Sequence, residues 1–155
     1  MSLASISNRY EKSPQLRKLG EALSQFQNIT LEGLTGSALS FVLAHAFKSS
    51  ELPFLVVLND KEEAAYFLND LEQMLGETEV LFYPGSYRRP YQIEVTDNAN
   101  VLLRAEVLNR INSRKKPAII VTYPDALFEK VVTRKQLDKN TLKVKLGDTL
   151  SLDFL

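Results

Sequence analysis

The order of apolar and polar positions predicts helices and strands in alternation along most of the chain. After Ser13-Pro14, apolar residues recur at helical spacing to about Gln25, which predicts a first helix. From residue 27 onward, short apolar runs alternate with longer segments of helical spacing. Strands are expected at 28–32, 54–58, 80–83 and 118–122, and helices at 38–47, from the 59–60 cap to Gly76, at 97–112 and at 124–128. Such alternation predicts an α/β fold, a parallel sheet with helices on both faces.

Two of these elements carry a prediction about burial. The run at 54–58 (FLVVL) is apolar throughout, which is typical of a strand buried on both faces of a parallel sheet. The helix that Asp97 is expected to cap has an apolar stripe that should face the core. That stripe consists of Val101, Leu102, Ala105, Leu108 and Ile111.

The pattern divides the chain into three parts. Residues 1–26 form an N-terminal helical region, and residues 27–132 form the α/β domain. After about residue 133, Leu142, Val144 and Leu146 alternate with lysines, which predicts a half-exposed strand. We expect residues 133–155 to begin a second subdomain that continues in a longer protein.

The turn before the second helix resembles a phosphate-binding loop, whose pattern is G-x-x-x-x-G-K-[ST] between a strand and a helix. In the segment Gly33-Leu34-Thr35-Gly36-Ser37-Ala38-Leu39-Ser40, Gly33 and Ser40 keep the outer positions of the pattern. Ala38 replaces the second glycine and Leu39 replaces the lysine that reaches the β- and γ-phosphates. We therefore expect a degenerate P-loop that neither binds nor hydrolyses ATP. On this segment alone the alternative is equally good: Gly33 and Gly36 only turn the chain, and Leu39 is a core residue.

Longer strings of sequence resemble a known family. The segment 31–47 (LEGLTGSALSFVLAHAF) is similar to the P-loop and first helix of the excision-repair helicase subunit UvrB, without the catalytic lysine. The segments 54–75 (FLVVLNDKEEAAYFLNDLEQML), 80–92 (VLFYPGSYRRPYQ) and 117–131 (PAIIVTYPDALFEKV) follow in the same order. Together they most resemble the N-terminal, UvrB-like module of the bacterial transcription-repair coupling factors (Mfd), in which the N-terminal P-loop is degenerate.

This resemblance implies a degenerate P-loop (RecA/UvrB-like) fold and a role in nucleotide excision repair. The parent protein would be a cytoplasmic, ATP-dependent DNA translocase that displaces stalled RNA polymerase, with its motor far downstream. The present chain would recruit the damage-recognition ATPase UvrA and contribute to autoinhibition. Residues 142–155 (LKVKLGDTLSLDFL) resemble the entry to the UvrA-contacting subdomain, whose contact residues are expected beyond Leu155.

The loop at 84–96 departs from the family. UvrB carries a long aromatic DNA-gripping hairpin near this position, and the coupling factors commonly carry a tryptophan in an acidic stretch. This loop is short, and the chain has no tryptophan. Tyr87, Arg88, Arg89 and Tyr91 could form an ordinary ordered loop, contact a protein or stack on single-stranded nucleic acid.

Composition narrows the remaining functions. The absence of cysteine excludes disulfides and thiolate metal sites, and the one histidine, His45, lies in an apolar helix. Lys+Arg and Asp+Glu are both 19, so the basic excess of most DNA-binding domains is missing. No stretch approaches the ~20 apolar residues of a membrane span.

We expect no catalytic residue, no metal and no cofactor. A divergent P-loop hydrolase is the competing hypothesis, and Leu39 is the residue against it.

Overall fold

The computed structural model describes residues 2–25, 28–50, 52–87, 97–113, 116–131, 133 and 135–136. The helices are α1 (Leu3–Glu11), α2 (Pro14–Gln25), α3 (Ala38–Ser50), α4 (Lys61–Leu75), α5 (Asn98–Ser113) and α6 (Pro124–Phe128). The strands are β1 (Phe54–Val57), β2 (Val80–Tyr83) and β3 (Ile119–Thr122). The predicted second subdomain at 133–155 lies almost entirely outside the described residues. No described helix is both long and apolar enough to cross a membrane.

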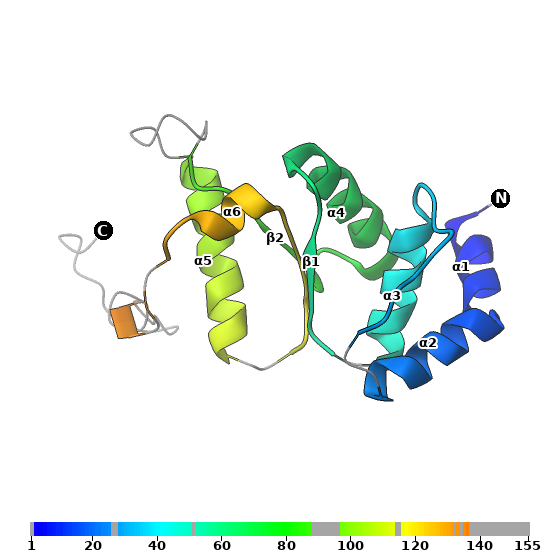
Figure 1. Ribbon diagram of the computed structural model, residues 1–155. Coiled ribbons are helices and arrows are strands. Elements are labelled where there is room, and N and C mark those ends of the chain that lie inside the picture. The colour runs from blue at the N-terminus through cyan, green and yellow to red at the C-terminus, as the bar shows by residue number, and fades with distance from the viewer. Residues whose placement is uncertain are drawn as a thin grey trace, which may run out of the picture.

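Within the described residues, β1, β3 and β2 form one parallel sheet in that spatial order. In the register, Phe54 and Val80 both lie opposite Ile119. Helices α3 and α4 lie on one side of the sheet, and α5 and α6 lie on the other (Figure 1). The predicted α/β class, with a parallel sheet and helices on both faces, is therefore confirmed. This architecture is compatible with a RecA-like fold.

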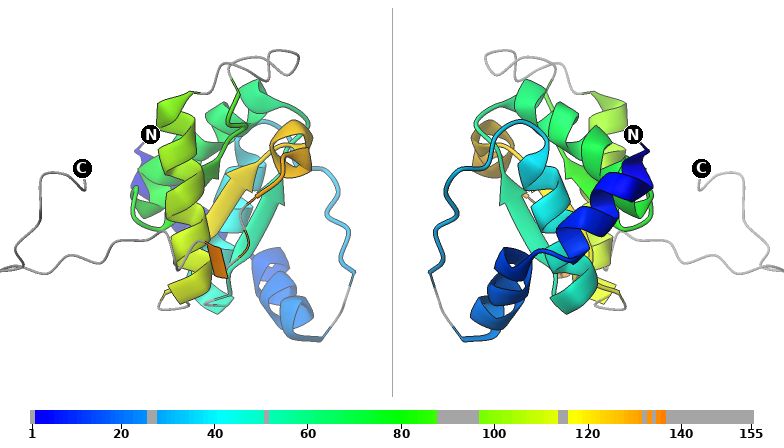
Figure 2. Two further views of the ribbon diagram at one scale, coloured as in Figure 1. Left: turned by 90° about the vertical axis from the view of Figure 1, so that its left-hand side faces the viewer. Right: turned by 90° about the vertical axis from the view of Figure 1, so that its right-hand side faces the viewer.

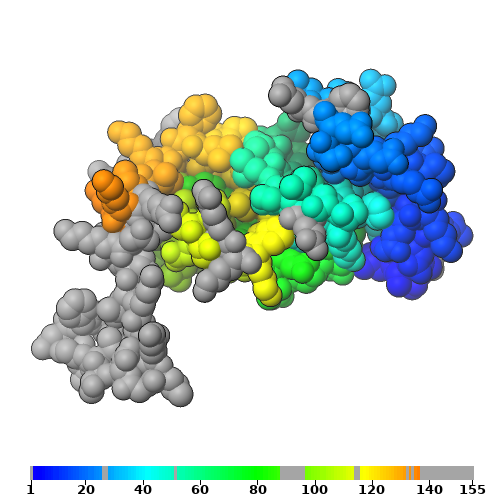
Figure 3. Space-filling view, turned by 90° about the horizontal axis from the view of Figure 1, so that it is seen from below, coloured from blue at the N-terminus to red at the C-terminus, as the bar shows by residue number. Residues whose placement is uncertain are grey.

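The core lies where the central strand meets the helices. Ile119 and Val121 of β3 are fully buried, as is Leu71 of α4. Burial of each such side chain stabilises the fold by about 1.5–3 kcal/mol. The amino-terminal helices contact α3 from outside and form one end of the molecule (Figure 3). Tyr10 of α1 stacks on Phe41 of α3, with ring centroids 5.0 Å apart.

Several local predictions hold. Helix α2 begins at Pro14 and ends at Gln25, as the spacing indicated. Asp60 caps α4 by accepting a hydrogen bond from the Glu63 backbone at 2.8 Å, and Glu62 and Glu63 occupy its first turn. Helix α1 was not foreseen. None of its residues is buried, so it leaves a weak apolar signal in the sequence.

The strand predicted at 28–32 is wrong. Residues 28–32 are irregular and exposed, and no backbone hydrogen bond joins them to β1 within the described chain. They run along the outside of the molecule, beside the sheet (Figure 2). A strand needs a neighbouring strand to satisfy its backbone donors and acceptors, whereas an exposed segment leaves them open to water. The edge of β1 that faces away from β3 thus has no partner strand among the described residues.

The prediction that the 54–58 strand is buried on both faces is also wrong. Its side chains alternate, with Leu55 and Val57 exposed by 60% and 48%. Helix α5 packs on β2 and leaves the outer strand β1 uncovered on that side (Figure 2). A continuous apolar run predicts burial only when helices cover the whole width of the sheet.

The predicted inner face of α5 is partly wrong. Leu102 and Ile111 are exposed by 72% and 52%, whereas the buried residues are Arg104 and Val107. The helix is rotated so that a charged side chain enters the protein. The polar partners of Arg104, described below, account for this orientation.

Candidate functional site

The segment from Gly33 to Ser40 joins the irregular chain to α3 and lacks the preceding strand of a P-loop. Gly33 and Gly36 have φ angles of 78° and 54°, a region that favours glycine, so the predicted glycine-bounded turn is present. The Ala38 amide donates to the Thr35 carbonyl at 3.2 Å. A phosphate-binding loop aims such amides at its ligand. Here this donor is already engaged within the turn.

Ser40 occupies the position at which a working P-loop places a hydroxyl for Mg²⁺. Its side chain is 1% exposed, and its hydroxyl lies 3.2 Å from Oδ2 of Asp70 on α4. The contact joins α3 to α4, which lie on the same side of the sheet. In this arrangement the Ser40 hydroxyl serves helix packing.

Leu39, at the position of the P-loop lysine, is 37% exposed. It lines an apolar pocket of about 160 Å³ between α2, the 28–31 segment, α3 and β1. The facing side chains include Leu19 and Leu23 of α2 and Leu31. Leu39 therefore lies at the contact of α2 and the irregular 28–31 segment with α3. The neighbouring Ala38 is half-buried at the start of the helix.

The second candidate surface, the loop after β2, is described only in part. Tyr87 is half-buried and lies at the carboxyl end of the sheet. Arg88, Arg89 and Tyr91 lie outside the described residues. The structure therefore places one of the four predicted interaction residues and leaves the other three as predictions.

A buried arginine, which the sequence pattern did not single out, holds the start of this loop. Arg104 of α5 is 6% exposed, and its Nη1 donates to the carbonyls of Pro84 at 2.7 Å and Ala126 at 3.0 Å. Its guanidinium carbon lies 4.1 Å from the centre of the Tyr83 ring. The same Nη1 is 3.6 Å from Glu129. Arg104 thereby joins α5 to the chain that follows β2 and β3.

Glu129 extends this network to the loop. Its carboxylate accepts hydrogen bonds from the Ser86 amide at 2.9 Å and from the Ser86 hydroxyl. The preceding residue of the loop is also held, because the buried Tyr123 hydroxyl accepts a hydrogen bond from the Gly85 amide at 2.8 Å. The only sequence signal for the network was the place of Arg104, three residues before Val107 on the buried side of α5. Its partners lie about twenty residues away along the chain and could not be read from spacing.

The two tyrosines of this region have perturbed ionisation. Burial raises the pKa of Tyr83 above 10.0, the Arg104 charge opposes that rise, and the Glu129 charge adds to it. Burial likewise raises the pKa of Tyr123. The hydrogen bond from Gly85 lowers it in part, and the charge of Glu129 raises it further. Both phenols remain neutral at physiological pH, so neither supplies a base.

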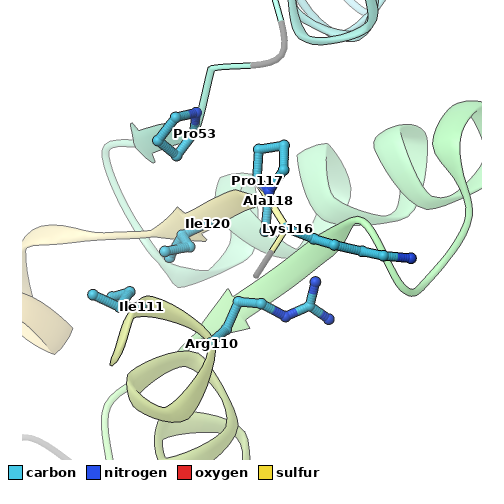
Figure 4. Close-up of a pocket in the computed structure, with 7 residues that line it drawn as sticks. All are labelled: Pro53, Arg110, Ile111, Lys116, Pro117, Ala118 and Ile120. Atoms are coloured by element: carbon cyan, nitrogen blue, oxygen red, sulfur yellow. The ribbon is translucent and has the colours of Figure 1, made fainter. Parts of the chain in front are cut away.

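A separate pocket of about 440 Å³ lies at the opposite end of the sheet, where β1 and β3 begin (Figure 4). Its wall is mostly apolar, and its charged side chains, Arg110 and Lys116, are both basic. The described residues contain no group of three or more Asp, Glu or His side chains that could hold a metal ion.

Comparison with known proteins supports a UvrB-like relationship. No protein-family profile matches the chain. The chain is 25% identical to UvrABC system protein B of Mycoplasma genitalium over 136 residues. The match covers 77% of this chain and 20% of that relative, so the chain corresponds to about one fifth of the relative's length.

Proposed function

We propose that this chain is a non-catalytic, UvrB-like interaction domain of the transcription-repair coupling factor type. The geometry of the degenerate loop carries the proposal. Ser40 is bound to Asp70, Leu39 lines an apolar pocket, and the Ala38 amide is used within the turn. These three positions thus serve helix packing or the turn itself, which supports a framework without ATP chemistry.

The finer assignment to the coupling factors rests on the order of the four resembling segments. Under that assignment, the chain recruits UvrA to stalled RNA polymerase, and contacts with other domains of the same protein keep the parent translocase inhibited. RNA polymerase and DNA would be bound by the whole, cytoplasmic protein. The chain itself would hold no cofactor. The UvrA contacts would lie beyond Leu155.

The test is a capture experiment with purified UvrA as prey. One bait is the present chain, and the other continues past Leu155 until the second subdomain is complete. We expect the longer bait to retain UvrA and the shorter one to retain little, because the contacting residues come after the shared part. Failure of the folded longer bait to retain UvrA would refute the recruitment role.

A further inference from the structure

The pocket of about 440 Å³ at the amino end of the sheet is an apolar groove with a basic rim. It lies between the starts of β1 and β3 and the last turn of α5 (Figure 4). We call it the amino-end groove. Its apolar wall consists of Pro53, Ile111, Pro117, Ala118 and Ile120, and its rim consists of Arg110 and Lys116.

The apolar surface continues from the groove onto β1. In the register of the sheet Leu55 lies opposite Ile120, so both side chains are on the same face. Leu55 is largely exposed there, because α5 packs on β2, and Ile111 is exposed on the opposite wall. Contiguous apolar surface that is bordered by polar residues marks an interaction site. The groove and its extension along β1 therefore offer one apolar surface to a partner.

Positive charge gathers beside this surface. The side chains of Arg110 and Lys116 extend in the same direction on one side of the groove, away from Pro53 and Ile111 (Figure 4). Both also line an adjoining hollow of about 790 Å³, which Lys48 of the last turn of α3 lines as well. Glu79 is the acidic residue among the described lining. Within the described part of the chain none of the three cations forms an ion pair, although the chain as a whole has no net charge.

Arg110 is held in place for a ligand. Its Nη2 donates a hydrogen bond to the Thr78 carbonyl at 3.2 Å, which fixes the guanidinium where the groove meets the hollow. The other N–H groups of this guanidinium have no acceptor among the described residues. A guanidinium presents its donors as a rigid fork that matches the two oxygens of a carboxylate. The rim is thus arranged to receive an acidic group.

The apolar wall decides between two classes of acidic ligand. A single-stranded nucleic acid supplies phosphates, but its bases stack on exposed aromatic rings. Phe47 is the aromatic residue among the described lining of the groove and the hollow, and it is only 5% exposed. An apolar groove instead accommodates an apolar side chain of a protein, with polar contacts at the rim.

We propose that the amino-end groove binds an exposed segment of a partner protein in which an apolar side chain is followed by acidic residues. The apolar side chain fills the space between Ile111 and Ile120. The carboxylates bind Arg110 and Lys116 at the rim. This inference rests on the groove alone and does not depend on the proposed repair function.

The test is a titration of the ¹⁵N-labelled chain with the capped peptide Gly-Leu-Asp-Glu-Gly, followed by NMR. One control peptide replaces the acids by their amides (Gly-Leu-Asn-Gln-Gly), and the other replaces leucine by serine (Gly-Ser-Asp-Glu-Gly). We expect saturable shifts at the Ala118 and Ile120 amides with the first peptide. Each control should bind at least about fivefold more weakly, because it lacks either the ion pairs or the buried side chain. Added salt should weaken the acidic peptide, since the rim is open to solvent.

Variants assign the binding to the groove. Ile111→Ser should weaken the peptide at least about fivefold, whereas Leu102→Ser, at a 72% exposed position on the same helix, should leave binding unchanged. The double variant Arg110→Gln, Lys116→Gln should weaken it similarly. Removing the same charge from α2 (Arg17→Gln, Lys18→Gln) should not.

Four results would overturn the proposal. These are the absence of saturable shifts at the groove, equal binding of either control peptide, equal losses in a variant and its matched control, and binding of a short oligothymidylate at the same amides as tightly as the acidic peptide. UvrA and Mg-ATP are absent from this titration, so its failure is distinguishable from failure of the repair function.

Discussion

Replacing Arg104 with methionine tests whether the buried guanidinium holds the carboxyl end of the sheet together. The change keeps an unbranched side chain but removes the charge and both hydrogen bonds, which Nη1 makes to Pro84 and Ala126. Hydrogen bonds from a charged donor contribute about 1.5–3 kcal/mol each. The Glu129 carboxylate also loses its neighbouring cation.

Two effects reduce this loss. Nη2 of Arg104 is buried without a partner among the described residues, so its desolvation already costs stability in the natural protein. Glu129 keeps its hydrogen bonds from Ser86 after the substitution. Removing one partner of a buried ion pair costs 3–5 kcal/mol, and we place this substitution at the lower end, about 3 kcal/mol.

Urea unfolding followed by circular dichroism measures the effect. The matched control is Arg110→Met on the same helix, whose guanidinium makes one exposed hydrogen bond, to the Thr78 carbonyl at 3.2 Å. We expect the control to lose less than about 1 kcal/mol. A double-mutant cycle with Glu129→Gln should give a coupling of about 1 kcal/mol or more. A loss at Arg104 no larger than at Arg110, or additivity with Glu129→Gln, would refute the reasoning.

Two further substitutions probe the site. Ser40→Ala removes the contact with Asp70 and should cost about 1–2 kcal/mol of stability in urea unfolding; an unchanged midpoint would show that the contact contributes nothing. Tyr123→Phe leaves the buried Gly85 amide without its acceptor and should cost about 1–3 kcal/mol, unlike Tyr66→Phe at a 77% exposed position. Folding raises the pKa of Tyr123, so the phenol in the unfolded chain ionises at a lower pH than in the folded chain. Its contribution to the free energy of unfolding is therefore complete below pH 10 and is lost as the pH rises above 10. The gap between the natural protein and Tyr123→Phe should therefore narrow above pH 10, and a constant gap would contradict the assigned shift.

The fold could be predicted from the sequence wherever local pattern and tertiary context agree. The strands at 80–83 and 119–122 combine apolar runs with turn residues, and helices pack on them. The segment 28–32 has the same local signal, but it finds no neighbouring strand. Likewise, the apolar character of Leu55 does not reveal that α5 covers only the far strand.

Of the candidate site, only the backbone conformation of the turn could be predicted from the sequence. The spacing of Gly33 and Gly36 indicated a turn that requires left-handed backbone, and both have positive φ. The partner of Ser40, by contrast, is thirty residues away on another helix. Arg104 was assigned to no role because periodicity favours apolar residues for the inner face. Polar contacts between distant segments leave no periodic signal in the sequence.

The central claim is that the Gly33–Ser40 segment packs helices and binds no nucleotide. Calorimetric titration with Mg-ATP tests it, with the natural chain beside the double substitution Ala38→Gly, Leu39→Lys. We expect no saturable heat from the natural chain. The substituted chain should also fail to bind, because no strand precedes the turn and Ser40 remains bound to Asp70. Saturable binding of Mg-ATP by the natural chain, with a micromolar Kd, would contradict the claim and favour a divergent hydrolase.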